Sequence, residues 1–199
     1  MQIRRLPADE DAVRRETEEL WLPYHRELEA TVENHALVDD VPLDEEVEFR
    51  LDLLESEGYR AWVVVDTDED ATDEDIADEV VTDEDSADED VPDEDVANTD
   101  LADVDGEFVG FVMTNVDESP PVFDRPDRLI IGDIYVREAY RGTGLARDLI
   151  DRAVERARET GCEELALDVD VDNERALAFY EKLGFEPRRH RMRVPVDEL

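Results

Sequence analysis

Apolar residues recur along the chain at two different spacings, which predict an alternation of strands and helices. Short runs rich in β-branched and aromatic residues are typical of strands, and apolar residues three or four positions apart are typical of amphipathic helices. The predicted strands cover residues 1–6, 59–65, 107–116, 128–136, 164–171 and 189–196. The predicted helices cover residues 9–20, 43–58, 144–160 and 173–184. This order of elements predicts a mixed α/β (α+β) fold.

The ends of the predicted helices are marked by residues that interrupt helices. Val47, Leu51 and Leu54 form the apolar stripe of the second helix. Pro23 is expected to kink or end the first helix, because proline lacks a backbone N–H. Glycines, which favour the left-handed conformation found after many helices, mark the ends of the other three at Gly58, Gly161 and Gly184.

One segment between two predicted strands has no apolar face as a helix or as a strand. From Thr67 to Gly106 the sequence reads TDEDA TDEDI ADEVV TDEDS ADEDV PDEDV ANTDL ADVDG. A five-residue period turns successive repeats by about 140° on a helix and changes faces on a strand. Residues 66–105 carry 21 acidic side chains and no basic one. We therefore predict that residues 66–106 are a disordered acidic insertion in a single domain, residues 1–199.

Two roles for this insertion stay open on the sequence. It can be an inert surface loop, because closure entropy rises only slowly with loop length. Alternatively, it is an arm that binds cations or a basic partner. The repeat lacks the glycine and the spaced ligands of an EF-hand loop, and no Cys/His spacing is typical of zinc, so no metal site is predicted.

The acidic character extends beyond the insertion. The chain has 60 acidic and 21 basic residues and a formal net charge of −39, and Lys182 is the single lysine. Outside residues 66–105 there are still 39 acidic side chains against the 21 basic ones. Concentrated salt would screen the resulting self-repulsion. This composition predicts a cytoplasmic protein of a halophile.

The same features exclude several partners. A strongly negative surface argues against nucleic acid, which needs clustered cations. No apolar run approaches the length of a membrane span and no secretory leader is expected, so no membrane partner is predicted. Cys162 is the single cysteine and is expected to be a small buried hydrophobe without chemistry.

A glycine-rich turn stands where a predicted strand leads into a predicted helix, in the stretch YRGTGLARDLI. Gly142 and Gly144 let the backbone approach an anion closely, Arg141 adds a positive charge, and the helix start supplies free N–H groups. The stretch is neither a P-loop nor a dinucleotide GxGxxG motif. On spacing alone it is either a phosphate cradle or a tight connection.

The residues around this turn resemble the acetyl-coenzyme A motif of the Gcn5-related N-acetyltransferase (GNAT) family. That motif runs Gln/Arg-x-x-Gly-x-Gly/Ala after a strand ending in an apolar-x-Val pattern, and Arg141, Gly144 and Ala146 match it. The later stretch NERALAFYEKLGF is similar to the family's downstream motif, with Asn173, Ala176, Tyr180, Gly184 and Phe185 in the usual order. Both motifs lie within residues 129–185, and the acidic insertion is a departure from the pattern.

The resemblance implies a mostly antiparallel central sheet, flanked by helices, in which two strands splay apart to admit acetyl-coenzyme A. The backbone of the strand GDIYV would bond the pantetheine arm through Ile134 and Val136, and the glycine turn would hold the pyrophosphate. The residues expected to bind the coenzyme are Ile134, Tyr135, Val136, Arg141, Gly142, Thr143, Gly144, Leu145, Ala146, Asn173 and Tyr180.

The implied reaction transfers an acetyl group to a primary amine by direct attack in a ternary complex. The Ile134 N–H would polarise the thioester carbonyl, and Tyr180 would protonate the leaving thiolate. Tyr180 is alternatively a core aromatic, and Asn173 is alternatively a helix cap. Some relatives use a strand glutamate as the base, but Ile130 and Gly132 fill those positions here. Asp133 is the remaining strand carboxylate for a base or a water-positioning group, although alternation turns it away from Gly132 and Ile134.

The acceptor is expected to be a small-molecule amine or a protein amine, and a homodimer is among the expected assemblies. His25 and His35 lie near Trp21 and Tyr24, in the region where relatives build the acceptor pocket. We expect these histidines to be surface or packing residues more often than catalytic ones. A second hypothesis is a non-catalytic acyl-coenzyme A binding protein that recruits a basic partner through its acidic arm. A third is a solubility factor that acts through its charge.

Overall fold

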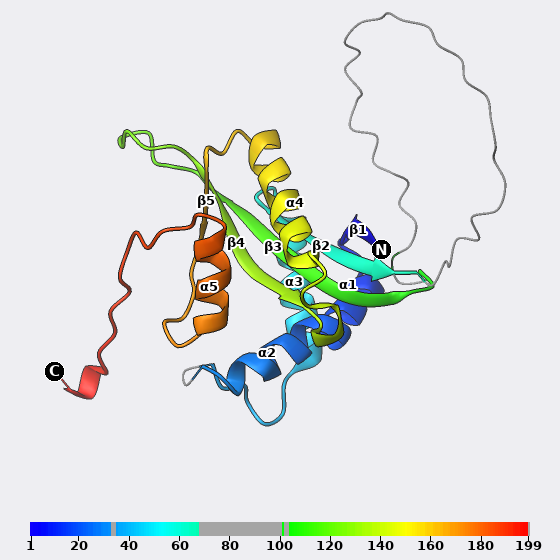
Figure 1. Ribbon diagram of the computed structural model, residues 1–199. Coiled ribbons are helices and arrows are strands. Elements are labelled where there is room, and N and C mark those ends of the chain that lie inside the picture. The colour runs from blue at the N-terminus through cyan, green and yellow to red at the C-terminus, as the bar shows by residue number, and fades with distance from the viewer. Residues whose placement is uncertain (33–34, 68–100, 102–103, 199) are drawn as a thin grey trace, which may run out of the picture.

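The computed structural model describes all residues except 33–34, 68–100, 102–103 and 199. Five strands form one sheet in the order β1-β2-β3-β4-β5 (Figure 1). They are β1 (Gln2–Arg5), β2 (Tyr59–Asp66), β3 (Glu107–Asp117), β4 (Arg128–Val136) and β5 (Glu164–Leu167). Neighbouring strands are antiparallel except β4 and β5, which are parallel. The mixed, mostly antiparallel sheet is therefore confirmed.

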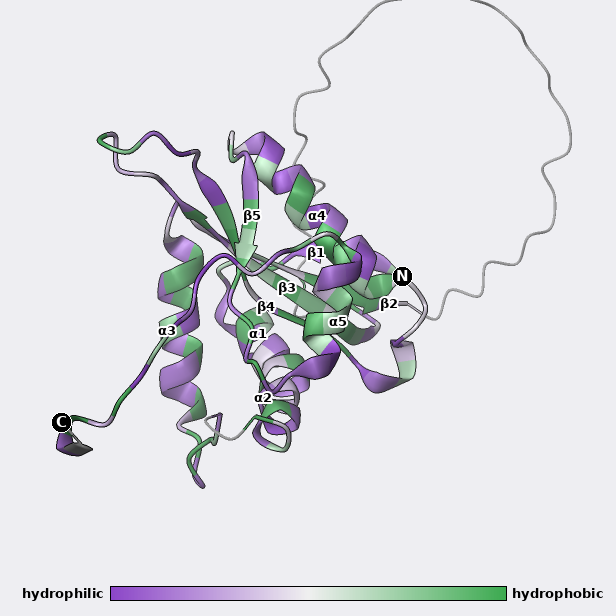
Figure 2. Ribbon diagram, turned by 60° about the vertical axis from the view of Figure 1, so that its left-hand side comes forward, coloured by the Kyte–Doolittle hydropathy of each residue, from purple (hydrophilic) through white to green (hydrophobic). Residues whose placement is uncertain are grey.

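Helices cover both faces of the sheet and enclose two apolar cores. They are α1 (Glu10–Glu16), the π-helical turn η1 (Thr17–Trp21), α2 (Leu22–Glu29), α3 (Leu43–Glu55), the 3₁₀ turn η2 (Glu138–Tyr140), α4 (Leu145–Glu159), α5 (Glu174–Lys182) and the 3₁₀ turn η3 (Val196–Glu198). The N-terminal helices share one core with Phe108 and Phe111 of β3, whereas α4 and α5 share the other with Val109 and Val112. Figure 2 shows the helices striped in green and purple around largely green strands.

The longest helix, α4, shows how the apolar pattern selects the buried face. Leu145, Leu149, Ala153 and Ala157 recur every fourth residue, and all four are buried. Side chains at this spacing lie on one side of a helix, so α4 packs that stripe on β3 and β4. The helix ends just before Gly161, whose φ of 72° is left-handed, as predicted.

The first helical segment does not end at Pro23, so this part of the expectation is wrong, and the alternative of a kink at Pro23 stays a prediction. The Asp9 side chain caps α1 by accepting from the Ala12 N–H at 3.0 Å. Helical backbone then continues from Glu10 through η1 and α2 to Glu29. The wider turn of η1 immediately precedes Pro23, and a π turn accommodates a break in the regular hydrogen-bond ladder that proline cannot complete.

The last predicted strand, residues 189–196, is also absent from the described chain. Residues 185–195 form no regular element, and β5 ends at Leu167 rather than at residue 171. A strand is stable only when its backbone groups are paired, and the C-terminal tail runs away from the sheet in Figure 1. Arg189, Arg191 and Arg193 are all exposed there.

The predicted pairing of β2 with β3 is confirmed, with Asp66 opposite Glu107 at the end of the hairpin where the predicted insertion joins the two strands. The two ends of the predicted insertion belong to the folded body. Asp66 closes β2, and Leu101 is buried in the N-terminal core with Val104 packed against it. Residues 68–100 and 102–103 lie outside the described residues, so their disorder stays a prediction.

Candidate functional site

β4 and β5 separate partway along their length. Their parallel pairing ends where Ile131 lies opposite Leu167, the last residue of β5. β4 continues to Val136. Residues 132–136 therefore have no strand partner on the β5 side within the described chain, and we call this unpaired edge of β4 the gap. The predicted splay of the two strands is confirmed.

A bulge in β4 lies at the start of the gap. Gly132 and Asp133 together oppose the single residue Met113 of β3, and such a bulge interrupts the alternation of side chains. A Cβ built on Gly132 would lie 3.8 Å from the Met113 Cβ, in the N-terminal core. Asp133 is on that same side, beside His25. The expectation that Asp133 faces away from Gly132 is wrong; it does face away from Ile134, which packs in the other core.

The backbone of β4 presents polar groups to the gap. The Arg137 N–H donates to the Val109 carbonyl at 2.9 Å, so Arg137 directs its backbone groups at β3. In an antiparallel pair, only alternate residues do so. Tyr135 therefore also faces β3, whereas Ile134 and Val136 direct their N–H and C=O groups into the gap. These are the two residues that the sequence placed against the pantetheine arm.

The glycine turn leads into the N-terminus of α4 beside this gap. Gly142 and Gly144 have φ values of 82° and 104°, and no atom lies within 4 Å of a Cβ built on either one. Backbone conformation, rather than lack of space, therefore requires glycine. No side chain caps α4, and the N–H groups of Gly144, Leu145 and Ala146 donate no hydrogen bond within the described chain. The Thr143 hydroxyl is occupied, because it donates to the Tyr140 carbonyl.

The Arg141 side chain lies at the end of β4 instead of over the glycine turn. Its Nε donates to the Val136 carbonyl at 2.9 Å, and its guanidinium pairs with Glu27 of α2. It also lies over the Tyr135 ring, 5.6 Å from the centroid. The Tyr135 hydroxyl donates to Glu27 at 2.6 Å. A phosphate contact by Arg141 would therefore require it to leave Glu27, and its predicted role stays a prediction.

Tyr180 lies on α5 between Phe179 and Phe185, with ring centroids 5.3 and 5.5 Å away. Burial, with a smaller effect from the negative charge of Asp133, raises the pKa of Tyr180 to about 12. The hydroxyl therefore keeps its proton at neutral pH and can act only as a donor of that proton. Tyr180 is therefore a packed aromatic residue, as one alternative predicted, and its ring lies against the core that contains residues of β4 and β5.

Asn173 performs the capping role that the sequence allowed. Its Oδ1 accepts from the Ala176 N–H at 3.1 Å and begins α5. A contact with the coenzyme through its remaining amide group stays a prediction. Cys162 is buried in the core under α4, as expected.

Asp133 lies near His25, and His25 in turn contacts His35. The sequence did not connect these three residues. The His25 Nε2 lies 3.7 Å from the Asp133 Oδ2. The His25 Nδ1 lies 2.7 Å from the His35 Nε2, and the two rings are nearly coplanar at 2°. His25 is buried against Trp21, with ring centroids 4.2 Å apart. No sequence signal marks this contact, since the residues come from α2, a following loop and β4.

A buried ion pair lies beneath this group. The Arg50 guanidinium of α3 contacts the Glu16 carboxylate of α1, and both side chains are almost fully buried. Burial raises the pKa of Glu16 to about 7, although Arg50 opposes the increase. Burial and the Asp133 carboxylate also raise the pKa of Tyr24, which is next to His25.

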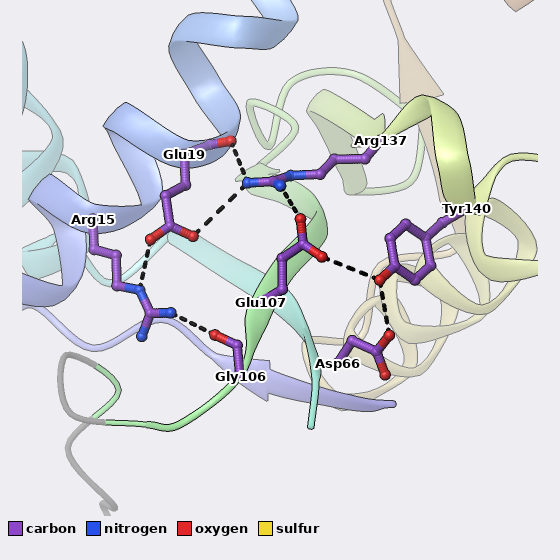
Figure 3. Close-up of a pocket in the computed structure, with 7 residues that line it drawn as sticks. All are labelled: Arg15, Glu19, Asp66, Gly106, Glu107, Arg137 and Tyr140. Carbon is purple, nitrogen blue, oxygen red and sulfur yellow. Dashed lines mark hydrogen bonds and ion pairs between the residues drawn. The ribbon is translucent and has the colours of Figure 1, made fainter. Parts of the chain in front are cut away.

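A polar pocket of about 510 Å³ lies where β2 ends and β3 begins (Figure 3). It is lined by Arg15, Glu19, Asp66, Gly106, Glu107, Arg137 and Tyr140. Arg137 pairs with Glu19 and Glu107, and the Tyr140 hydroxyl lies 2.8 Å from the Asp66 carboxylate. These contacts anchor both ends of η2, the turn that carries the chain from β4 to the glycines.

Two further kinds of site are absent from the described part of the chain. None of the helices there has the length and apolar character needed to cross a membrane. No group of three or more His, Cys, Asp or Glu side chains in the described ranges is arranged to hold a metal ion.

Comparison with curated proteins finds relatives that share only part of their length with this chain. The chain is 38% identical over 80 residues to the N-alpha-acetyltransferase MAK3 of Arabidopsis thaliana, covering 40% of each chain. It is 41% identical over 76 residues to the glucosamine 6-phosphate N-acetyltransferase of Trypanosoma brucei brucei, covering 37% of this chain and 50% of that protein. The chain thus spans about half or less of these two relatives.

Comparison with solved structures and with family models covers more of the chain. A tetramutant of the BH1408 protein of Bacillus halodurans superposes with a TM-score of 0.67 at 17% identity, over 98% of this chain and all of that one. The aminoglycoside N-acetyltransferase AAC(6')-Iy, in complex with CoA, has a TM-score of 0.58 at 14% identity, over 98% and 93%. The model of the acetyltransferase (GNAT) family matches residues 58–185, well over half of the chain, and includes the splay and the glycine turn. The protein therefore belongs to the GNAT family of acetyltransferases.

Proposed function

We propose that this protein transfers an acetyl group from acetyl-coenzyme A to a primary amine, by direct attack of the amine in a ternary complex. The observation that carries the proposal is the gap beside β4, which adjoins the free N–H groups at the start of α4. One end of the gap offers strand-like hydrogen bonds, and the other offers an anion site at a helix N-terminus. A molecule with an amide-containing arm and a pyrophosphate fits both.

Six of the predicted residues then have a definite task. The N–H groups of Gly144, Leu145 and Ala146 would hold the pyrophosphate, and the backbone of Ile134 and Val136 would orient the arm. The Ile134 N–H would stabilise the negative charge that develops on the thioester oxygen. Tyr180 would protonate the departing thiolate. Acetyl-coenzyme A is the co-substrate that fits the family, and two similar structures of AAC(6')-Iy contain CoA.

The acceptor is proposed only as a class. The similar proteins are named for acetylating protein N-termini, glucosamine 6-phosphate and aminoglycosides, and a primary amine is what those acceptors share. The carboxylates of Asp133 and Glu27 lie on the α2 side of β4 and would attract a cationic amine. A homodimer stays a prediction.

The function is tested by combining coenzyme binding with thiol release. Acetyl-coenzyme A at 100 times its Kd should stabilise the protein by about 2.7 kcal/mol, a rise in melting temperature of about 5–10 °C. Free thiol should then appear when a panel of small amines and peptide N-termini is added. Thermal protection without thiol from any amine would support the non-catalytic binding hypothesis instead, and no protection at all would contradict both.

The glycine turn offers a matched pair of variants for the binding step. Gly144→Ala should raise the Kd for acetyl-coenzyme A at least tenfold, because a side chain at this left-handed φ distorts the free N–H groups. Gly161→Ala carries a similar backbone cost of about 1–2 kcal/mol at the far end of α4 and should leave the Kd unchanged. An equal effect of both variants would exclude a phosphate role for this turn.

We also propose that the acidic surface and insertion adapt the protein to the cytoplasm of a halophile. The net charge of −39 should repel a polyanionic coenzyme at low salt. We therefore expect the Kd for acetyl-coenzyme A to fall from about 0.1 M to 1 M KCl, as the screening length shrinks from about 10 Å to about 3 Å. Isothermal titration across that range measures the trend, and a Kd that only increases with salt would contradict it.

A further inference from the structure

The histidine pair beside Asp133 contains a polar atom without a partner. The Nε2 of His25 is buried and has no hydrogen bond within the described chain. It lies 3.7 Å from the Asp133 carboxylate, which is too long for a hydrogen bond but within the range of an ion pair. Most buried polar groups are paired, so this atom is arranged either for a bound molecule or for a moving proton.

The second ring nitrogen of His25, Nδ1, contacts a residue that is closer to solvent. Its Nδ1 is hydrogen bonded to the His35 Nε2 at 2.7 Å, and the nearly coplanar rings align the two nitrogen atoms. His35 is only half-buried, whereas His25 is buried. Asp133, His25 and His35 therefore follow one another from the bulge of β4 toward solvent, with one hydrogen bond between the histidines and a 3.7 Å separation between His25 and Asp133 that must shorten for a proton to pass.

Catalysis by direct attack requires a route by which the amine proton can leave the site. A primary amine is mostly protonated at neutral pH and must lose a proton before or during attack. Asp133 directly precedes Ile134, whose N–H faces the gap, and the positions of the glutamate used by some relatives hold Ile130 and Gly132. The Asp133 carboxylate lies on the α2 side of β4, where we propose that the cationic amine binds, and there it would receive the amine proton. Without an outlet it would keep that proton.

We propose that Asp133, His25 and His35 form a proton relay that removes the amine proton to solvent; this inference rests on the proposed acetyltransferase function. An amine N–H bond breaks as an O–H bond forms on Asp133. That proton passes to the His25 Nε2 while the His25 Nδ1 gives its own proton to the His35 Nε2. The His35 Nδ1 releases a proton to water. One proton leaves the amine, one reaches solvent, and no electrons are transferred.

Titratable and charged groups from several neighbouring elements lie around the relay. They comprise carboxylates, one arginine and three tyrosines. These groups are Glu16 of α1, Glu46 and Arg50 of α3, Asp170 after β5, Tyr24 of α2, Tyr59 of β2 and Tyr180 of α5. A pH profile of the reaction would therefore report these neighbouring groups together with the relay, and not one residue alone.

Variants of the three histidines test the relay. His25→Gln should lower kcat for thiol release about a hundredfold at pH 7, the range of a lost general base. The loss should narrow toward high pH, where solvent deprotonates the amine. His35→Ala should lower kcat by a smaller factor in dilute buffer, and added imidazole should restore it. His190→Gln, on the exposed tail, is the control and should behave as the wild type.

Coenzyme binding separates the relay from the function itself. Both relay variants should keep the thermal protection by acetyl-coenzyme A. If the wild-type protein releases no thiol with any amine, the proposed function fails. If it is active and His35→Ala keeps the wild-type kcat from pH 6 to pH 9 in dilute buffer, the relay is wrong. The half-buried position of His35 makes that variant decisive even where His25→Gln does not fold.

Discussion

Replacing Arg50 by methionine is expected to lower the free energy of unfolding at pH 8 by about 3–5 kcal/mol. Its guanidinium contacts the Glu16 carboxylate in the core between α1 and α3, where both side chains are almost fully buried. Without Arg50, an ionised carboxylate would stay in an apolar environment with its charge uncompensated. Denaturant unfolding at one fixed salt concentration measures the loss.

The size of this loss should depend on pH. Burial raises the pKa of Glu16 from 4.5 to about 7, and Arg50 lowers it. The folded state therefore binds more protons than the unfolded state between these values, and stability falls as pH rises through that window. Removing Arg50 raises the pKa of Glu16 further. The variant should consequently be closest to the wild type near pH 5 and furthest from it above pH 7.

Two controls identify the buried charge as the cause. The double variant Glu16→Leu with Arg50→Met should recover most of the stability, because apolar packing can replace a buried ion pair. Arg14→Met removes a more exposed cation, which pairs with Asp44 at 2.7 Å, and should cost far less stability than Arg50→Met because solvent screens the pair. An Arg50→Met loss that is the same at pH 5 and pH 8 would contradict the explanation.

The fold could be predicted from local pattern because most of its elements bury one apolar stripe or face. Val47 and Leu54 on α3, and Val63 and Val65 on β2, are buried in one core where their spacing places them. The C-terminal tail has a strand-like pattern of apolar residues, but it forms no strand and its residues are not buried in a core. Strand formation depends on a partner, and the residues of the tail alone cannot specify one.

The site was predictable where a single short motif determines the backbone. Gly142 and Gly144 adopt the left-handed conformations that the turn requires, and they lead into α4 as expected. The bulge at Gly132 and Asp133 was not predictable, because regular alternation is the default for a strand and only pairing with β3 reveals the extra residue. Its effect is to move Asp133 to the face that α2 covers.

The contacts of His25 and Arg50 depend on the tertiary structure. His25 is 108 residues before Asp133, and each residue by itself has an ordinary explanation as a packing or surface group. Glu16 and Arg50 belong to helices whose other charges are largely exposed, so their burial could not be inferred from charge alone. Distances between distant segments follow from the packing of α1–α3 on the sheet.

Replacing Tyr180 by phenylalanine is expected to lower kcat by about a hundredfold to a thousandfold with little change in coenzyme affinity. Phenylalanine keeps the packing against Phe179 and Phe185 and removes only the hydroxyl. Burial raises the pKa of Tyr180 to about 12, so its hydroxyl stays protonated below that pH. Removing the hydroxyl should therefore lower kcat by the same factor across the pH profile below pH 12. Steady-state thiol release with a saturating amine measures the change.

Comparing acetyl donors with different leaving thiols tests whether Tyr180 is the general acid. A thiolate with a lower pKa needs less help to depart, so the loss in Tyr180→Phe should shrink when the acetyl donor is a thioester of a more acidic thiol. Tyr59→Phe is the matched control, because Tyr59 is another partly buried tyrosine whose pKa burial raises, but it lies on β2. Because Tyr59 lies near Asp133 and not beside the departing thiolate, this variant should lower kcat far less than Tyr180→Phe and by the same factor for every donor. A Tyr180→Phe loss that is the same for every donor would instead mean that the hydroxyl orients the substrates, because only proton transfer to sulfur is sensitive to the basicity of the thiolate.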